Sequence, residues 1–311
     1  MNAFVSRLCT TLMIGQMVMG AAFAESDVRF ERSLDRLDVK AGDKPLATYV
    51  WRDSTILRPY FAHLRTLGGV QVTRNHPPID GQDATDHADI HPGVWLAFGD
   101  VSGADFWRNK ATVKHVEFVE SPSTDEFGGG FAVKNAYLSG DKTLCEELCR
   151  VRFDMRPSGY LITWDSRFSG PDDFYFGDQE EMGLGFRVAT AIAVKNGGAI
   201  VNSDDLKNEP GVWGKQANWC DYSGTMDGRA VGILLMPDPG NFRRSWFHAR
   251  DYGVLVANPF GQNAFTKGTE SKIVVRKGES LRLRYGILVH EGEVDLNATY
   301  SDWMRSLKSS D

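Results

Sequence analysis

The amino-acid sequence predicts a mostly β protein: a large antiparallel β-sandwich with one C-terminal helix. Three observations lead to this prediction. Runs that alternate apolar and polar residues recur along the whole chain and are separated by turn-forming residues. Only the last segment has the residue spacing of an amphipathic helix. The chain has no regular alternation of strands and helices, which a parallel sheet would require.

The first 24 residues have the pattern of a secretory signal peptide. Arg7 supplies the positive charge, residues 8–19 are mostly apolar, and Ala22-Phe23-Ala24 resembles a cleavage site. The apolar stretch is too short and too interrupted to span a bilayer comfortably, and no second stretch of this kind follows. We therefore expect a signal peptide at 1–24, a single β-sandwich domain at 25–311, and a periplasmic or secreted protein without an integral membrane segment.

The strands follow one another along most of the chain. Two hairpins are clear: 148–155 with 160–164 across Arg156-Pro157-Ser158-Gly159, and 219–225 with 230–236 across Asp227-Gly228. A third is predicted between 272–275 and 280–289, across Arg276-Lys277-Gly278-Glu279. Further strands are predicted at 29–39, 46–51, 94–98, 113–120, 131–138, 187–194 and 253–257.

The carboxyl terminus is predicted to be a helix. Leu296, Tyr300, Trp303 and Leu307 recur at intervals of four, three and four residues, which gives one apolar stripe. We expect this helix to lie across a face or an edge of a sheet.

Charge and cysteine content narrow the possible partners. The net charge is −6 and the basic residues are dispersed, which argues against a nucleic-acid partner. Cys145, Cys149 and Cys220 follow the predicted signal peptide. A Cys145–Cys149 or a Cys145–Cys220 disulfide could form in an oxidising compartment, and the sequence does not choose between them. It does not determine the oligomeric state either.

The stretch from Arg74 to Trp107 combines histidines, aspartates and tryptophans with many prolines and glycines, as expected of a functional loop. His76 precedes two prolines on a rigid backbone, which suits an acid–base group. Asp86, His87 and His91 could bind a divalent ion, but bracing of the loop is the more ordinary explanation. We therefore predict no metal, with these three residues as the alternative.

Three further clusters contain candidate residues. Glu180 and Glu181 lead into a glycine-rich strand that contains Arg187, and either carboxylate could act as a base beside that charge. The segment 209–222 offers tryptophans and polar groups of the kind that bind sugars. In the segment 246–252, His and Arg side chains could serve an anionic group. The candidate binding residues are Trp95, Arg187, Trp213, Lys215, Trp219, Arg250, Tyr252 and Asn258.

Several well-known catalytic motifs are missing from the sequence. It contains no G-x-S-x-G elbow, no P-loop, no H-E-x-x-H and no dinucleotide-binding glycine fingerprint. Serine-hydrolase, nucleotide-dependent and zinc-protease functions therefore lose most of their support.

Five motifs resemble the bacterial "methane oxygenase PmoA-like" family of uncharacterised exported proteins. They lie at 58–78 (RPYFAHLRTLGGVQVTRNHPP), 86–107 (DHADIHPGVWLAFGDVSGADFW), 180–190 (EEMGLGFRVAT), 212–224 (VWGKQANWCDYSG) and 245–261 (SWFHARDYGVLVANPFG). The resemblance implies a β-rich fold similar to the galactose-mutarotase supersandwich. In mutarotase-like enzymes a histidine acid and a carboxylate base flank the sugar, and these roles can be carried over only by residue type. They would fall to His76, His91 or His248, and to Glu180, Glu181 or Asp221.

We therefore predict an exported carbohydrate-active enzyme that acts on a glycoside or a free sugar by acid–base catalysis, as a hydrolase, a lyase or an epimerase. The predicted catalytic residues are His76, His91, His248, Glu181 and Asp221, and the partner is a carbohydrate ligand. One alternative is a non-catalytic glycan-binding module, in which the histidines only brace loops. The other is a metal-dependent oxidoreductase, as the family label suggests.

Overall fold

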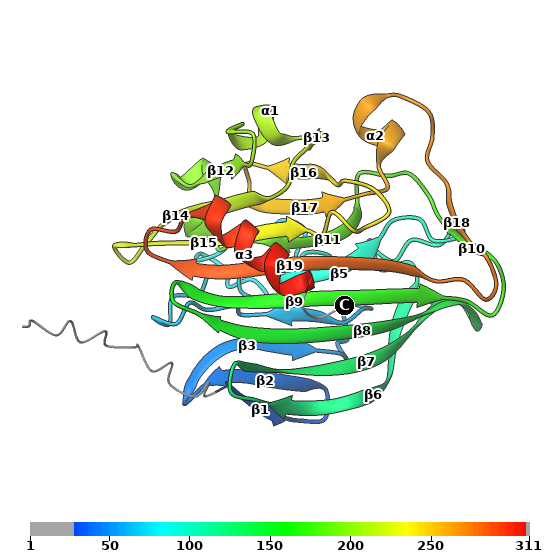
Figure 1. The fold of residues 1–311 in the computed structure, drawn as a ribbon, viewed down its shortest axis with the longest axis horizontal. Coiled ribbons are helices and arrows are strands. Elements are labelled where there is room, and N and C mark those ends of the chain that lie inside the picture. Colours follow the sequence, from blue (N-terminus) through cyan, green and yellow to red (C-terminus); the bar gives the residue numbers. More distant parts are fainter. Residues whose placement is uncertain (1–27, 309–311) are drawn as a thin grey trace, which may run out of the picture.

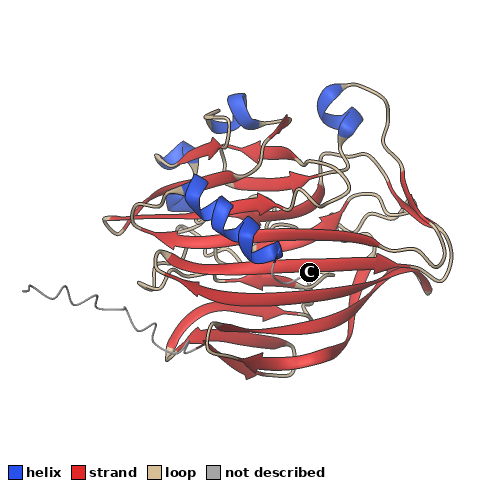
Figure 2. Ribbon diagram, viewed as in Figure 1, coloured by secondary structure: helices blue, strands red, loops and turns tan. Residues whose placement is uncertain are grey.

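The computed structural model describes residues 28–308, so the predicted signal peptide lies outside the described residues. Two antiparallel sheets pack face to face (Figures 1 and 2). The first has nine strands, in the order β1 (Val28–Arg32), β2 (Arg36–Ala41), β3 (Lys44–Val50), β4 (Tyr60–Ala62), β5 (Val94–Phe98), β11 (Met182–Arg187), β17 (Val254–Asn258), β16 (Trp246–Arg250) and β13 (Lys215–Gln216).

The second sheet has eight strands and forms the front layer of Figure 1. Their order is β12 (Ala199–Asn202), β14 (Cys220–Met226), β15 (Arg229–Pro237), β19 (Leu281–Glu291), β9 (Gly159–Ser169), β8 (Lys142–Arg156), β7 (Gly128–Ser139) and β6 (Thr112–Thr124). The mostly β, antiparallel sandwich predicted from the sequence is confirmed.

The core lies between the two sheets because each strand turns every second residue inward. On β8, Cys145, Glu147 and Cys149 face this core. The Glu147 carboxylate accepts hydrogen bonds from Asn135 Nδ2 at 2.9 Å and from Ser166 Oγ at 2.5 Å. Burial nevertheless raises the pKa of Glu147, because these hydrogen bonds only partly offset the loss of solvation of the carboxylate.

Two predicted hairpins are confirmed and the third is wrong. Strands β8 and β9 pair up to Arg156 and Gly159, and β14 and β15 join through Asp227 and Gly228, whose φ angles are both positive, as this tight turn requires. The residues Arg276 to Glu279 do form a turn. However, β18 (Ile273–Val275) pairs with β10 (Phe174–Phe176), whereas β19 pairs with β9 and β15.

Two other predicted strands have different limits. The run 29–39 is interrupted by a turn in which Ser33 N donates to Arg36 O, so it forms the β1–β2 hairpin. The strand predicted at 187–194 is displaced: strand β11 covers Met182–Arg187 and ends where the predicted one begins. The short 3₁₀ helices η1 (Thr190–Ile192) and η2 (Val194–Asn196) follow it. The real strand, β11, is buried on both faces, so its sequence shows no alternation.

The predicted C-terminal helix is confirmed as α3 (Leu296–Lys308), which crosses the outer face of the eight-stranded sheet (Figure 1). Trp303 and Leu307 are buried there against Leu161, Leu234 and Leu288. Two short helices, α1 (Asn208–Val212) and α2 (Gln262–Thr266), lie at the end of the nine-stranded sheet that carries β16.

Neither of the two disulfides that the sequence left open is present. Cys145, Cys149 and Cys220 are all free and buried, and they face the core from β8 and β14. Among residues 28–308, no helix is long and apolar enough to cross a membrane.

Candidate functional site on the outer face of the nine-stranded sheet

The outer face of the nine-stranded sheet presents most of the candidate residues. Along β4, β5, β11 and β16 the inward positions belong to the core, and the outward positions carry Tyr60, Trp95, Arg187, His248 and Arg250. These side chains come from segments far apart in the chain, and the pairing of the strands brings them onto one face.

Two loops, 75–93 and 99–111, cover the middle of this face, and two buried arginines hold them in place. Arg74 donates to the carbonyl oxygens of Ala84, Asp86 and His91. Arg58 donates to the carbonyl oxygens of Trp107 and Ile90, among others. Burial lowers the pKa of each guanidinium to about 10, so both remain charged at neutral pH.

The covering loops fill the middle of the face with aromatic rings. The His91 ring stacks on Trp95, with 5.0 Å between ring centres and 9° between planes, and Trp107 packs edge-on against both. Trp95 has no exposed surface, so no ring face remains for the sugar stacking predicted for it. Burial lowers the pKa of His91 well below its usual value, and the ring is enclosed rather than open to a substrate.

The residues considered for a metal site are engaged with other side chains. Both carboxylate oxygens of Asp86 accept hydrogen bonds from Arg187, at 2.9 and 2.8 Å, and His87 Nδ1 lies 2.9 Å from the same carboxylate. No group of three or more potential ligands occurs within residues 28–308. Asp86, His87 and His91 therefore brace the loop in this structure.

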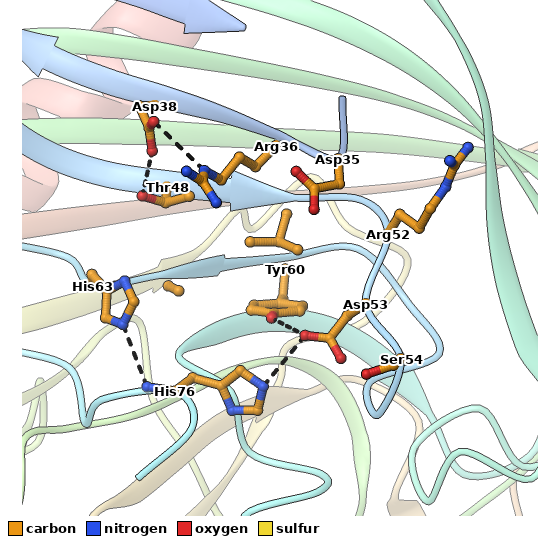
Figure 3. Close-up of a pocket in the computed structure, with 12 residues that line it drawn as sticks. Asp35, Arg36, Asp38, Thr48, Arg52, Asp53, Ser54, Tyr60, His63 and His76 are labelled. Carbon is orange, nitrogen blue, oxygen red and sulfur yellow. Dashed lines mark hydrogen bonds and ion pairs between the residues drawn. The ribbon is translucent and has the colours of Figure 1, made fainter. Parts of the chain in front are cut away.

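A cavity of about 880 Å³ opens beside the covering loops, over β2, β3 and β4 (Figure 3). We call it the His76 pocket. Tyr60 Oη donates to Asp53 Oδ2 at 2.6 Å, and His76 Nε2 lies 3.6 Å from the same oxygen. The backbone N–H of His76 donates to His63 Nε2 at 3.5 Å. The residues that line the His76 pocket are Asp35, Arg36, Asp38, Thr48, Val50, Arg52, Asp53, Ser54, Tyr60, Ala62, His63 and His76.

The neighbouring groups in the His76 pocket have different protonation states. Burial opposes ionisation of Asp53, but hydrogen bonds from Tyr60 and from the backbone N–H groups of Thr55 and Ile56 outweigh it and lower its pKa. Burial lowers the pKa of His76, although Asp53 acts in the opposite direction. At neutral pH an ionised carboxylate therefore lies beside a neutral imidazole.

A second polar group, the His248 cluster, lies at the other end of the face and consists of His248, Arg250, Glu180, Glu209 and Trp213. Arg250 binds Glu180 at 3.1 Å and Glu209 at 2.8 Å, and its Nε donates to His248 Nε2 at 3.3 Å. His248 Nδ1 therefore carries the proton, 3.5 Å from Glu180 Oε2. Burial first, and then Arg250, lower the pKa of His248 to about 3, so the ring is neutral.

Tyr252 connects the His248 cluster with Arg187. The Arg187 guanidinium lies 4.6 Å from the centre of the Tyr252 ring, and the His87 ring stacks on that ring at 5.8 Å. Burial raises the pKa of Tyr252, whereas Arg187 and Arg250 act to lower it. The structure thus brings His248, Arg250, Tyr252 and Arg187 into one contiguous group.

Other candidate residues lie apart from this group. Glu181 pairs with Arg108 at 2.8 Å, and Lys215 is exposed on β13. Asn258 is buried and donates to the carbonyl oxygens of Gln179 and Glu180, so it positions that loop. Trp219 and Asp221 lie on the outer face of the other sheet, where Trp219 is buried beneath α3.

Of the residues that line the His76 pocket, sequence reasoning identified only His76, and it missed Asp53, Tyr60 and His63, which lie around that histidine. Tyr60 and His63 lie within the first resemblance motif, 58–78, but neither belongs to a recognisable spacing. Asp53 follows β3 in a short turn and looks like any turn aspartate. Only the fold shows that these residues meet His76.

Comparison with solved structures gives remote similarities. An α-galactosidase from Lactobacillus brevis is 7% identical with a TM-score of 0.44, and the match covers 86% of this chain and 40% of that one. A galactose mutarotase related enzyme from Lactobacillus acidophilus is 8% identical, with a TM-score of 0.35. A GalM/aldose epimerase homologue from C. elegans is 9% identical, with a TM-score of 0.36; both matches cover 86% of this chain and 100% of the other.

The chain thus spans two fifths of the length of the α-galactosidase. At these identities and TM-scores the likeness assigns no activity. No curated protein matches the chain. The resemblance to the PmoA-like family stays a prediction, because the matching family model has a different description. That model matches residues 36–304, and the chain therefore belongs to the family of unknown function DUF6807.

Proposed function

We propose that this protein is an exported carbohydrate-active enzyme whose acid–base chemistry takes place in the His76 pocket. One observation carries the proposal. A neutral histidine and an ionised aspartate lie 3.6 Å apart in the wall of a cavity of about 880 Å³. Perturbed titratable groups that converge in a large cavity are typical of catalytic sites.

The lining of the pocket suits a hydroxylated ligand. Its volume lies within the range of about 300–1,000 Å³ that is usual for small-molecule sites. Asp35 and Asp38 supply acceptors, Arg36 and Arg52 supply donors, and Ser54 can do either, so hydroxyl groups of a sugar would find partners on several sides.

The two central residues have different roles in this proposal. His76 Nε2 is the base, because burial keeps the ring neutral at neutral pH, and a neutral imidazole has one unprotonated nitrogen that can accept a proton. Asp53 is too far away for a hydrogen bond to the resting imidazole, but it is near enough to stabilise the imidazolium that forms when His76 accepts a proton. Tyr60 and the 55–56 backbone hold Asp53 in place.

His63 has a supporting role. Nε2 of His63 accepts a hydrogen bond from the backbone N–H of His76, so the proton of the neutral His63 ring lies on its Nδ1. Burial lowers the pKa of His63 as well, and the ring is only partly buried. His63 would therefore act as a hydrogen-bond donor to the substrate.

The test is to incubate the purified protein with plant and algal oligosaccharides and with free sugars, and to follow products by chromatography and anomer exchange by NMR. We expect His76→Ala to slow turnover by about 10²–10⁴-fold, the usual contribution of a general base. Asp53→Asn should slow turnover as well, because the imidazolium of His76 would lose its counter-charge. His115→Ala is the control, because it removes a half-buried histidine of β6 that does not line the pocket.

Two outcomes would contradict this proposal. Unchanged rates in both pocket variants would remove the chemistry from His76 and Asp53. Binding of an oligosaccharide without any product, in the wild-type protein, would favour the non-catalytic glycan-binding module instead.

A further inference from the structure

The eight-stranded sheet has a polar site of its own, on the face that carries α3. Asp221 on β14 and His290 on β19 lie there, 3% and 5% exposed, with His290 Nε2 2.9 Å from Asp221 Oδ1. Both line a cavity of about 360 Å³, which we call the His290 pocket. The face is opposite to the one that carries the His76 pocket, so the two sites are separate.

A glycine makes room for the imidazole. Ser223, Gly232 and His290 are direct neighbours across β14, β15 and β19. A Cβ atom on Gly232 would lie 2.6 Å from His290 Nε2 and 2.6 Å from Ser223 Cβ. Real Cβ atoms do not come so close to other atoms. Only glycine at position 232 therefore leaves room for the side chains of Ser223 and His290.

One polar atom of this site has no partner. His290 Nδ1 is buried and makes no hydrogen bond within residues 28–308, while Nε2 bonds to Asp221. If Nε2 donates to the carboxylate, Nδ1 keeps a lone pair that can accept a hydrogen bond. Buried polar atoms are nearly always satisfied, so the orphaned nitrogen of a histidine that lines a cavity points to a ligand that satisfies it.

The remaining lining defines the ligand. Ser223 and Thr225 contribute hydroxyl groups, while Val294 and Leu296 contribute apolar surface. Within residues 28–308 no lysine or arginine lines the cavity, and its one carboxylate is already bonded to His290. An anion would find no cation here, and a cation would compete with the imidazole for Asp221.

We propose that the His290 pocket binds a small, neutral, hydroxyl-rich molecule of about monosaccharide size. A hydroxyl group both donates and accepts, so one hydroxyl can satisfy the orphaned nitrogen while others bond to Ser223 and to Thr225. The volume is within the usual range for small ligands of about 300–1,000 Å³.

Serine-based acyl transfer does not fit the same residues. In a Ser–His–Asp relay the acid and the serine use opposite nitrogens of the imidazole. Here Asp221 bonds to Nε2, and Ser223 approaches the Nε2 side as well, across Gly232. These residues therefore lack the arrangement that serine-based acyl transfer needs.

The experiment titrates the full-length protein with four probes: D-glucose, D-galactose, D-glucuronate and D-glucosamine. The chain has seven histidines, so the Cε1–H resonance of His290 can be followed by NMR and assigned by its loss in His290→Ala. We expect at least one neutral sugar to shift this resonance, and both charged sugars to bind more weakly. Failure of all four probes to shift it, or a preference for a charged probe, would overturn the proposal.

Variants locate the binding. Gly232→Ala should weaken it at least about tenfold, because the new methyl group displaces His290. Gly211→Ala is the matched control, since its Cβ would meet only ordinary contacts, the nearest at 3.6 Å. If Gly232→Ala fails to fold, Thr225→Val removes one hydroxyl from the exposed rim of the pocket and should still weaken binding. Unchanged affinity in Thr225→Val, or in a folded Gly232→Ala, would overturn the proposal.

The outcome is independent of the proposed enzyme activity. Asp53→Asn alters the His76 pocket on the opposite face and should leave the His290 titration unchanged. A failure here would leave the His76 chemistry standing, and the reverse also holds.

Discussion

Five of the seven histidines are held neutral by burial, and this affects the stability of the protein. Burial lowers the pKa of His63, His76, His91, His115 and His248. In the unfolded chain a histidine titrates near pH 6.5. Below that pH the unfolded state therefore binds protons that the folded state does not bind, and the free energy of unfolding declines as the pH falls.

His248 gives the sharpest test, because its pKa is lowered to about 3 while only 5% of its surface is exposed. One displaced proton changes the free energy of unfolding by about 1.4 kcal/mol per pH unit. Between about pH 6 and pH 4, His248→Gln should therefore reduce the slope of stability against pH by about that amount. Urea unfolding across this range measures both slopes, and equal slopes would contradict the neutral, buried state of His248.

At the level of elements, α3 depends on the sheet beneath it. Trp303 is 1% exposed and lies over Gly286 of β19, where a Cβ atom would come within 2.7 Å of the indole. The apolar stripe of α3 is thus matched to a hollow in the sheet, and burial of that stripe, rather than helix propensity, stabilises so short a helix.

Trp303→Ala should lower the free energy of unfolding by about 3–5 kcal/mol, as is usual for a large aromatic residue removed from a packed site. Ser301→Ala, at an exposed position of the same helix, should change it by less than about 0.5 kcal/mol. Chemical denaturation compares the two variants. Similar losses in both would mean that α3 is not docked through Trp303.

At the scale of the whole molecule, the two sheets seal three thiols between them. Cys145, Cys149 and Cys220 are at most 1% exposed, and burial raises the pKa of each. A thiol of this kind is protonated and inaccessible, so its reactivity reports the opening of the sandwich.

A thiol reagent such as DTNB should therefore leave these three cysteines unmodified in the native protein and modify all three after denaturation without a reductant. Mass spectrometry of tryptic peptides identifies which cysteines react. Two of these thiols that react only after reduction would show a disulfide that the structure does not contain.

The sequence predicted local features such as turns, but it did not predict which strands distant in the chain pair with one another. Asp227-Gly228 identified a turn because both residues accept a positive φ angle. The turn at 276–279 was equally visible, yet β18 pairs with β10, a partner far away in the chain. A turn signal fixes where the chain reverses and does not fix what the next strand hydrogen-bonds to.

The same limit applies to the candidate sites. Residue type marked His76 and Asp221 as chemically capable, but Asp53 and His290 reach them only through the order of the strands and loops. Trp95 and Trp219 were expected to stack on sugars because indoles often do so. Whether an indole is free depends on what covers it, and here a loop histidine and α3 occupy those positions.

The stack of His91, Trp95 and Trp107 fills the middle of the outer face with buried rings, and none of the three lines the His76 pocket. Within residues 28–308 no tryptophan lines that pocket. In the proposed enzyme, a sugar beside His76 would therefore be held by polar side chains, without an indole on which to stack.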